Sequence, residues 1–180
     1  MTCACPGECA PQHKSSPGVI EHDELILFVL VNPTTYKNGD LSAGCFSDSQ
    51  LKKGVQSVCR IRHTTAEEID RCVVAHLIKK EGRELHGSAA ATAGEIRAIR
   101  GPGGGQAFCV VDDPLHDEYN DPSRPDVKFE VFLAHAHLGF SAKTLSDESW
   151  NKNTRVALMA TLASTFKTRG CPIPIANWYA

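Results

Sequence analysis

The longest apolar stretch of the chain runs from Leu25 to Val31. It is short, contains several β-branched residues, and ends at Asn32-Pro33. A continuous apolar run of this length is typical of a strand that is buried on both faces. We therefore predict that residues 24–31 form a strand at the centre of a β-sheet.

Four other segments carry apolar residues in patterns that favour strands. In residues 56–62 polar and apolar positions alternate imperfectly, and in residues 129–137 Phe129, Val131 and Leu133 share one face. A glycine-rich connection at 101–105 separates two more predicted strands. The four segments are residues 56–62, 95–99, 107–112 and 129–137.

Two segments show the period of amphipathic helices. Thr64 and Glu67 have the spacing of a capping box, in which each side chain satisfies a backbone amide of the first turn. An apolar stripe follows at four-residue spacing, and Gly82 is a suitable end. A last helix is predicted to begin between Ser146 and Thr154 and to end at Gly170.

These elements predict an α+β fold with a single domain over residues 24–180. Its sheet is expected to be mixed or mainly antiparallel, with about five strands and two main helices packed on it. Residues 1–23 contain almost no large apolar side chain and are rich in Cys, Pro, Gly and His. We interpret them as a Cys/His-rich N-terminal appendage, either a tail or a metal-folded knuckle.

Charge and composition argue against several classes of partner. The net charge is −2, and the 19 basic residues are scattered along the chain, so nucleic acid is an unlikely partner. The N-terminus lacks the basic and apolar regions of a signal peptide, and no run is long enough to span a membrane. We therefore predict a cytoplasmic protein whose cysteines are free thiols, metal ligands or redox groups rather than structural bridges.

The N-terminal appendage offers four soft metal ligands within a short segment. They are Cys3, Cys5, Cys9 and His13. Their number and type suit a closed tetrahedral zinc site, and a bound ion would offset the ordering entropy of a segment that has no core. The alternative is a disordered tail with reactive thiols.

Other Cys and His pairs are weaker metal candidates. Cys72 and His76 lie one helical turn apart, but core packing of Cys72 is the better interpretation. His135 and His137 would lie on one face of a strand, about 6.6 Å apart, a spacing that some metal enzymes use. Hydrogen-bonded or solvent-facing histidines are the alternative.

A set of acid–base residues supports a different function. Asp112 and Asp113 end a predicted strand just before Pro114, a place where carboxylates meet ligands in many enzymes. With His135, and with His63 after an earlier strand, they are the candidate catalytic residues of an enzyme; His116 and Arg62 could join them. The alternative is an acidic turn that faces water.

Parts of the chain resemble a group of small uncharacterised bacterial proteins. The matching pieces are NGDLSAGCF at 38–46, SVCR at 57–60, TTAEE at 64–68 and VVDDPL at 110–115. The order of turn, strand and capped helix is also similar to NAD-using ADP-ribosyltransferase-like folds. That second resemblance implies site roles for Tyr36, Arg62, His63 and Glu95.

Two functions follow from these observations. The first is a cytoplasmic accessory or interaction protein with a protein partner, whose N-terminal segment binds zinc. The second is an enzyme that acts on a nucleotide or an NAD-like small anionic substrate. The two hypotheses differ in whether Asp112 and Asp113 lie in a concave pocket.

Overall fold

A computed structural model describes residues 5–10, 14–42, 44–74, 83–116 and 131–179. Five strands form one antiparallel sheet in the order β5-β1-β4-β9-β6. The predicted α+β fold, with about five strands in a mainly antiparallel sheet, is therefore confirmed. The strands of this sheet are β1 (Leu25–Asn32), β4 (Gln56–Arg60), β5 (Glu84–Thr92), β6 (Phe108–Asp112) and β9 (His135–Phe140).

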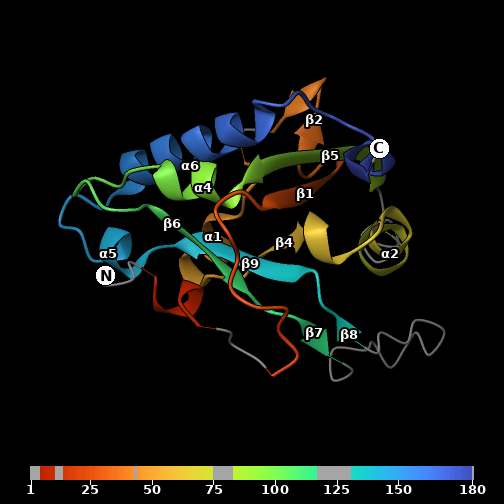
Figure 1. The fold of residues 1–180 in the computed structure, drawn as a ribbon. Coiled ribbons are helices and arrows are strands. Elements are labelled where there is room, and N and C mark those ends of the chain that lie inside the picture. The colour runs from red at the N-terminus through yellow and green to blue at the C-terminus, as the bar shows by residue number, and fades with distance from the viewer. Residues whose placement is uncertain (1–4, 11–13, 43, 75–82, 117–130, 180) are drawn as a thin grey trace.

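Two short ribbons accompany the main sheet. In each ribbon two strands of two residues pair antiparallel. They are β2 (Tyr36–Lys37) with β3 (Asp40–Leu41), and β7 (Leu115–His116) with β8 (Val131–Phe132). The β7–β8 ribbon extends the strands β6 and β9 beyond the end of the main sheet (Figure 1).

Strand β1 is buried on both faces, as its continuous apolar sequence predicted. Ile26, Phe28 and Leu30 belong to one hydrophobic cluster, whereas Leu27 and Val29 belong to a second cluster. Because successive side chains of a strand point to opposite faces, the two clusters lie on opposite sides of the sheet. A strand between two cores needs apolar residues at every position.

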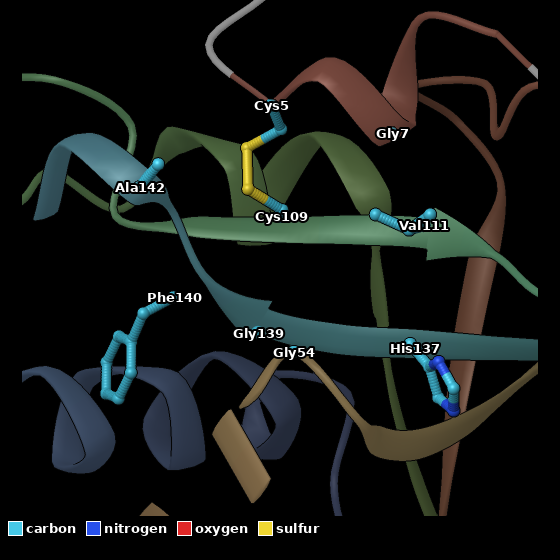
Figure 2. A pocket seen from close by; sticks show the side chains of 9 residues that line it. All are labelled: Cys5, Gly7, Gly54, Cys109, Val111, His137, Gly139, Phe140 and Ala142. Atoms are coloured by element: carbon cyan, nitrogen blue, oxygen red, sulfur yellow. A yellow bond between two sulfur atoms is a disulfide. The ribbon is translucent and has the colours of Figure 1, made fainter. Parts of the chain in front are cut away.

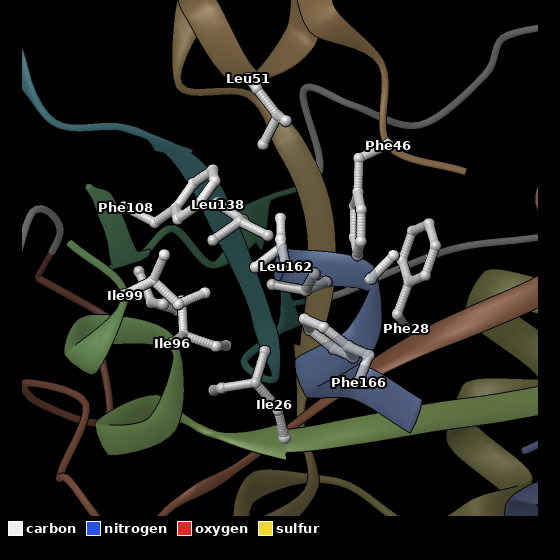
Figure 3. Close-up of a cluster of buried hydrophobic side chains, with 14 of the residues drawn as sticks. Ile26, Phe28, Phe46, Leu51, Ile96, Ile99, Phe108, Leu138, Leu162 and Phe166 are labelled. Carbon is white, nitrogen blue, oxygen red and sulfur yellow. The ribbon is translucent and has the colours of Figure 1, made fainter. Parts of the chain in front are cut away.

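The larger core lies between the sheet and the helices α4 (Ala93–Ala98) and α6 (Lys152–Lys167), which run along one side of the sheet in Figure 1. Figure 3 shows Leu162 and Phe166 of α6 packed beside Phe28 and Phe46. The rings of Phe28 and Phe46 are stacked, with their centroids 4.6 Å apart. Helix α6 follows the predicted last helix closely.

Several short helices complete the fold. Among the described residues, no helix combines the length and the apolarity needed to cross a membrane. The second core is covered by α2 (Ala66–Ile69) and by the 3-10 helix η5 (Ile175–Tyr179) near the C-terminus. The short helices are η1 (Pro6–Glu8), α1 (Asp48–Lys53), η2 (Ile61–His63), α2 (Ala66–Ile69), the π-helical η3 (Asp70–Val74), α5 (Ala142–Leu145) and η5 (Ile175–Tyr179).

The described part of the N-terminal segment packs on the domain. Ile20 is buried in the larger core, and the turn η1 lies against β6. Glu8 accepts hydrogen bonds from the side chain of Arg97, at 3.0 Å, and from the backbone amide of Val110, at 2.6 Å. These polar contacts hold a segment that has few apolar residues of its own.

Two local predictions were wrong. The predicted strand at 95–99 is the helix α4, because Thr92 and Glu95 form a capping box that begins a helix there. The predicted capping box at Thr64 is instead formed by Thr65 and Glu68, one residue later. The sequence also gave no prediction for β5, whose small residues pair with β1 over its whole length. The predicted apolar stripe beyond residue 74 lies partly outside the described residues.

Candidate metal centre

Polar side chains gather at one end of the main sheet. Strand β4 ends at Arg60, β6 ends at Asp112, and β9 begins at His135. The register pairs Ile26 with Arg60 and Asp112 with Ala136, so that these strand ends are neighbours. Residues that are far apart in the sequence therefore form one polar region.

Arg60 is the centre of a buried ion-pair network on the side of the larger core. Its Nε and Nη2 atoms donate to the two carboxylate oxygens of Glu24, at 2.6 and 2.9 Å. Its Nη1 donates to Asp112 Oδ1, at 2.5 Å, and to the carbonyl of Gly18, at 2.8 Å. Only 1% of the Arg60 surface is exposed, so the network orders this end of the sheet away from water.

The network explains the positions of two predicted catalytic residues. Asp112 is 3% exposed and is held by Arg60, which makes it part of a structural ion pair. His63 Nε2 lies 3.7 Å from Glu24 Oε1. Burial, together with the charge of Arg60, lowers the pKa of His63. The structure therefore places both residues beside Arg60, apart from the other two candidates.

Asp113, His135 and His137 form a separate cluster on the opposite face of the sheet. His135 and His137 share this face because they alternate along β9. Asp113 Oδ2 lies 3.1 Å from His137 Nδ1 and 3.7 Å from His135 Nδ1. One potential ligand atom from each residue lies within 4.8 Å of the others. This group could hold a metal ion.

The imidazole of His135 is fixed by two hydrogen bonds. Its Nδ1 lies 2.6 Å from the carbonyl of Asp113, and its Nε2 lies 3.1 Å from the hydroxyl of Ser57. A carbonyl only accepts, so Nδ1 carries the proton and Nε2 accepts from the Ser57 hydroxyl. A metal ion bound at Nε2 would replace that hydrogen bond. Burial lowers the pKa of His135 to about 4 and also lowers the pKa of His137. Neutral imidazoles oriented by a carbonyl are the form in which histidine binds metals.

An open cavity of about 170 Å³ adjoins this cluster. Figure 2 shows that it lies between β6, β9 and the N-terminal turn η1, with His137 at one end. The cavity is lined by Cys5, Gly7, Gly54, Cys109, Val111, His137, Gly139, Phe140 and Ala142. His137 therefore belongs both to the three-residue cluster and to the cavity wall.

The predicted zinc ligands of the N-terminal segment have a different role in the structure. Cys5 forms a disulfide with Cys109, and Cys9 is also disulfide-bonded. A disulfide sulfur is not a thiolate and cannot act as the expected ligand. The prediction that the cysteines form no structural bridges is therefore wrong. Cys3 and His13 lie outside the described residues.

The other cysteine–histidine pairs also remain apart from the cluster. Cys72 is buried in the second core, in agreement with the core interpretation, and His76 lies outside the described residues. Cys59 lies in the same core, where burial raises its pKa to about 12. Cys59 is therefore a packed residue of this core.

The residues suggested by the ADP-ribosyltransferase-like resemblance have separate partners. Tyr36 packs on His86, with ring centroids 5.0 Å apart, whereas Glu95 completes the cap of α4. Because His86 and Thr92 lie near opposite ends of β5, Tyr36 and Glu95 are separated by about 20 Å along the sheet. Arg62 forms an exposed ion pair with Asp23.

Sequence reasoning found part of the candidate centre. It grouped Asp113 with His135 and noted the metal-type spacing of His135 and His137. It missed Ser57 and the buried Arg60, because a serine and an arginine on an ordinary strand carry no distinguishing pattern. The signal for the complete cluster was weak, since Asp113 lies 22 residues before His135.

Comparisons with family models, with curated proteins and with solved structures found no match to this chain.

Proposed function

We propose that the protein binds a divalent transition-metal ion, zinc in the first instance, through Asp113, His135 and His137. The observation that carries the proposal is the convergence of three ligand atoms within 4.8 Å of one another. Two imidazoles and one carboxylate are a donor set that zinc and other first-row metals accept. The predicted zinc is thus retained, but at different residues.

The surroundings support a reactive centre over a purely structural one. Structural zinc sites have four protein ligands, whereas the described residues of this cluster supply three. His137 is 24% exposed and lines a cavity, so that a fourth ligand could approach from outside. Bound zinc would supply Lewis acidity and lower the pKa of a bound water.

The proposal favours an enzyme over the accessory role. An accessory protein with a protein partner in the cytoplasm stays a prediction from the sequence. The Cys5–Cys109 disulfide favours a non-reducing setting instead, because thiols are kept reduced in most cytoplasms. Alkylation of free thiols in intact cells tests this setting, because Cys5 and Cys109 are protected from alkylation only while they form the disulfide.

Zinc titration into metal-free protein tests the proposal. We expect one ion per chain by calorimetry and by elemental analysis after dialysis. Asp113→Asn and His137→Asn are each expected to weaken zinc binding by at least tenfold, because each removes a ligand. His22→Asn is the matched control, since this histidine is exposed and outside the cluster.

Three results would contradict the proposal. They are the absence of zinc binding, binding that survives both ligand substitutions, and binding that His22→Asn weakens equally. Circular dichroism and thermal unfolding of each variant check that the fold is retained. The measurement is made on the oxidised protein, so that thiols of Cys5 and Cys109 do not compete for the ion.

A further inference from the structure

The open cavity beside His137 is lined mainly by apolar groups. The Cys5–Cys109 disulfide and Val111 form one side, and Phe140 and Ala142 lie toward the end away from His137 (Figure 2). Among the described residues that line the cavity, only His137 has a side chain that can carry a charge, since Cys5 and Cys109 are bonded to each other. Such walls disfavour a charged ligand and favour an apolar one.

Glycines leave this space free of side chains. Gly7, Gly54 and Gly139 contribute only backbone to the lining. A Cβ atom on Gly139 would lie 2.4 Å from Gly54 Cα, so the backbones of β9 and of the segment after α1 approach too closely for a side chain. A Cβ atom on Gly7 would meet Val111 at 3.0 Å. The close packing of the N-terminal segment on β6, and of the segment after α1 on β9, therefore requires glycine at these two positions.

We propose that this cavity binds a small, largely apolar organic molecule that presents one oxygen or nitrogen donor toward His137. The inference rests on the proposed metal centre, because the donor would reach the ion held by Asp113, His135 and His137. Within the cavity the apolar body would contact Val111 and the Cys5–Cys109 disulfide. This substrate class differs from the nucleotide or other anionic substrate that the sequence suggested.

The size of the cavity limits the ligand. Its volume is about 170 Å³. An apolar protein cavity of about 150 Å³ is large enough for benzene. From His137 to Phe140 the strand β9 rises by about 10 Å, which matches one six-membered ring with a short polar substituent. A nucleotide is far too large for this space.

A pair of probes with the same metal-binding head tests the inference. Benzohydroxamate and acetohydroxamate differ in a phenyl group against a methyl group. We expect the zinc-loaded protein to bind benzohydroxamate at least about tenfold more tightly, because the phenyl group is removed from water in the cavity. Calorimetry gives both affinities.

Substitutions of cavity residues test whether the preference for the phenyl probe arises in the cavity. Val111→Phe and Ala142→Phe are each expected to remove the preference for the phenyl probe. Ala142→Phe, at the end away from His137, is also expected to leave zinc and acetohydroxamate affinities unchanged. Val156→Phe is the control, since Val156 is 58% exposed on α6 and does not line the cavity. Two cavity variants keep the test valid if one of them fails to fold.

A second measurement needs no metal. Benzyl alcohol is titrated into the metal-free protein, and amide shifts are expected at Val111, Phe140 and Ala142. Zinc binding without a phenyl preference would overturn this inference and leave the proposed function standing. Absence of zinc binding would overturn the proposed function and the donor–metal contact, while benzyl alcohol shifts in the cavity would still support an apolar ligand. Absence of those shifts, or shifts elsewhere, would overturn the cavity as a ligand site.

Discussion

Glu24 and Arg60 are joined by two hydrogen bonds across neighbouring strands, at 2.6 and 2.9 Å. Both residues are 1% exposed, and 36 residues separate them in the sequence. The pair lies where β1 begins and β4 ends, beside the strand ends that carry Asp112 and His135. The buried ion pair therefore fixes the end of the sheet at which the candidate metal centre is built.

Substitution of Arg60 by methionine is expected to lower the free energy of unfolding by about 3–5 kcal/mol, because two buried carboxylates lose their counter-charge. Urea denaturation measures the change. Arg62→Met is the control, since the Arg62–Asp23 pair is 51% and 78% exposed, and a change below about 1 kcal/mol is expected. Equal effects of the two substitutions would show that Arg60 has no special structural role.

Removal of the Cys5–Cys109 disulfide is expected to destabilise the protein. The bridge joins residues 104 positions apart, so it restricts the unfolded chain strongly. Replacement of both cysteines by serine should cost about 2–5 kcal/mol in guanidinium denaturation. Cys171→Ser should have a much smaller effect, because Cys171 is a free thiol in a partly exposed position. Unchanged stability of the double variant would contradict the expectation.

Stability is expected to fall at high pH because of Cys59. Burial raises the pKa of this thiol from 9.0 to about 12, so the folded state binds its proton more tightly than the unfolded chain. The stabilisation is complete below pH 9 and is lost as the pH rises toward 12. Between pH 9 and pH 11 the wild-type protein should lose roughly 2 kcal/mol more than Cys59→Ala. Parallel urea curves at the two pH values measure the difference, and equal losses would contradict the predicted shift.

The start of α4 depends on a local cap. Thr92 Oγ1 accepts from the amide of Glu95, at 3.1 Å, and Glu95 accepts from the amide of Thr92, at 2.7 Å. Thr92→Ala should cost about 1 kcal/mol, whereas Thr92→Ser should be nearly neutral because serine is as good a cap. Thermal unfolding distinguishes them. Equal melting temperatures of the two variants would show that the hydroxyl is not required.

Elements with a strong local signal were predicted well. The apolar run of β1 and the amphipathic pattern of α6 each identify their own secondary structure, because both faces of β1 and one face of α6 are buried. Strand β5 was missed because its buried residues are mainly alanines, which favour neither helix nor strand by apolar pattern. It is a strand because β1 pairs with it along its length.

The candidate centre, too, was predictable from the sequence only in part. The sequence by itself determined the donor types, with two histidines at strand spacing and two carboxylates at the end of another strand. Only the tertiary structure decided that Asp113 joins His135 and His137 while its neighbour Asp112 turns to Arg60. The physical reason is the alternation of side chains in paired strands: adjacent residues face opposite sides of the sheet, and the partner on each side comes from a distant part of the chain. The pairing of Cys5 with Cys109 was decided in the same way, by the packing of the N-terminal segment on β6.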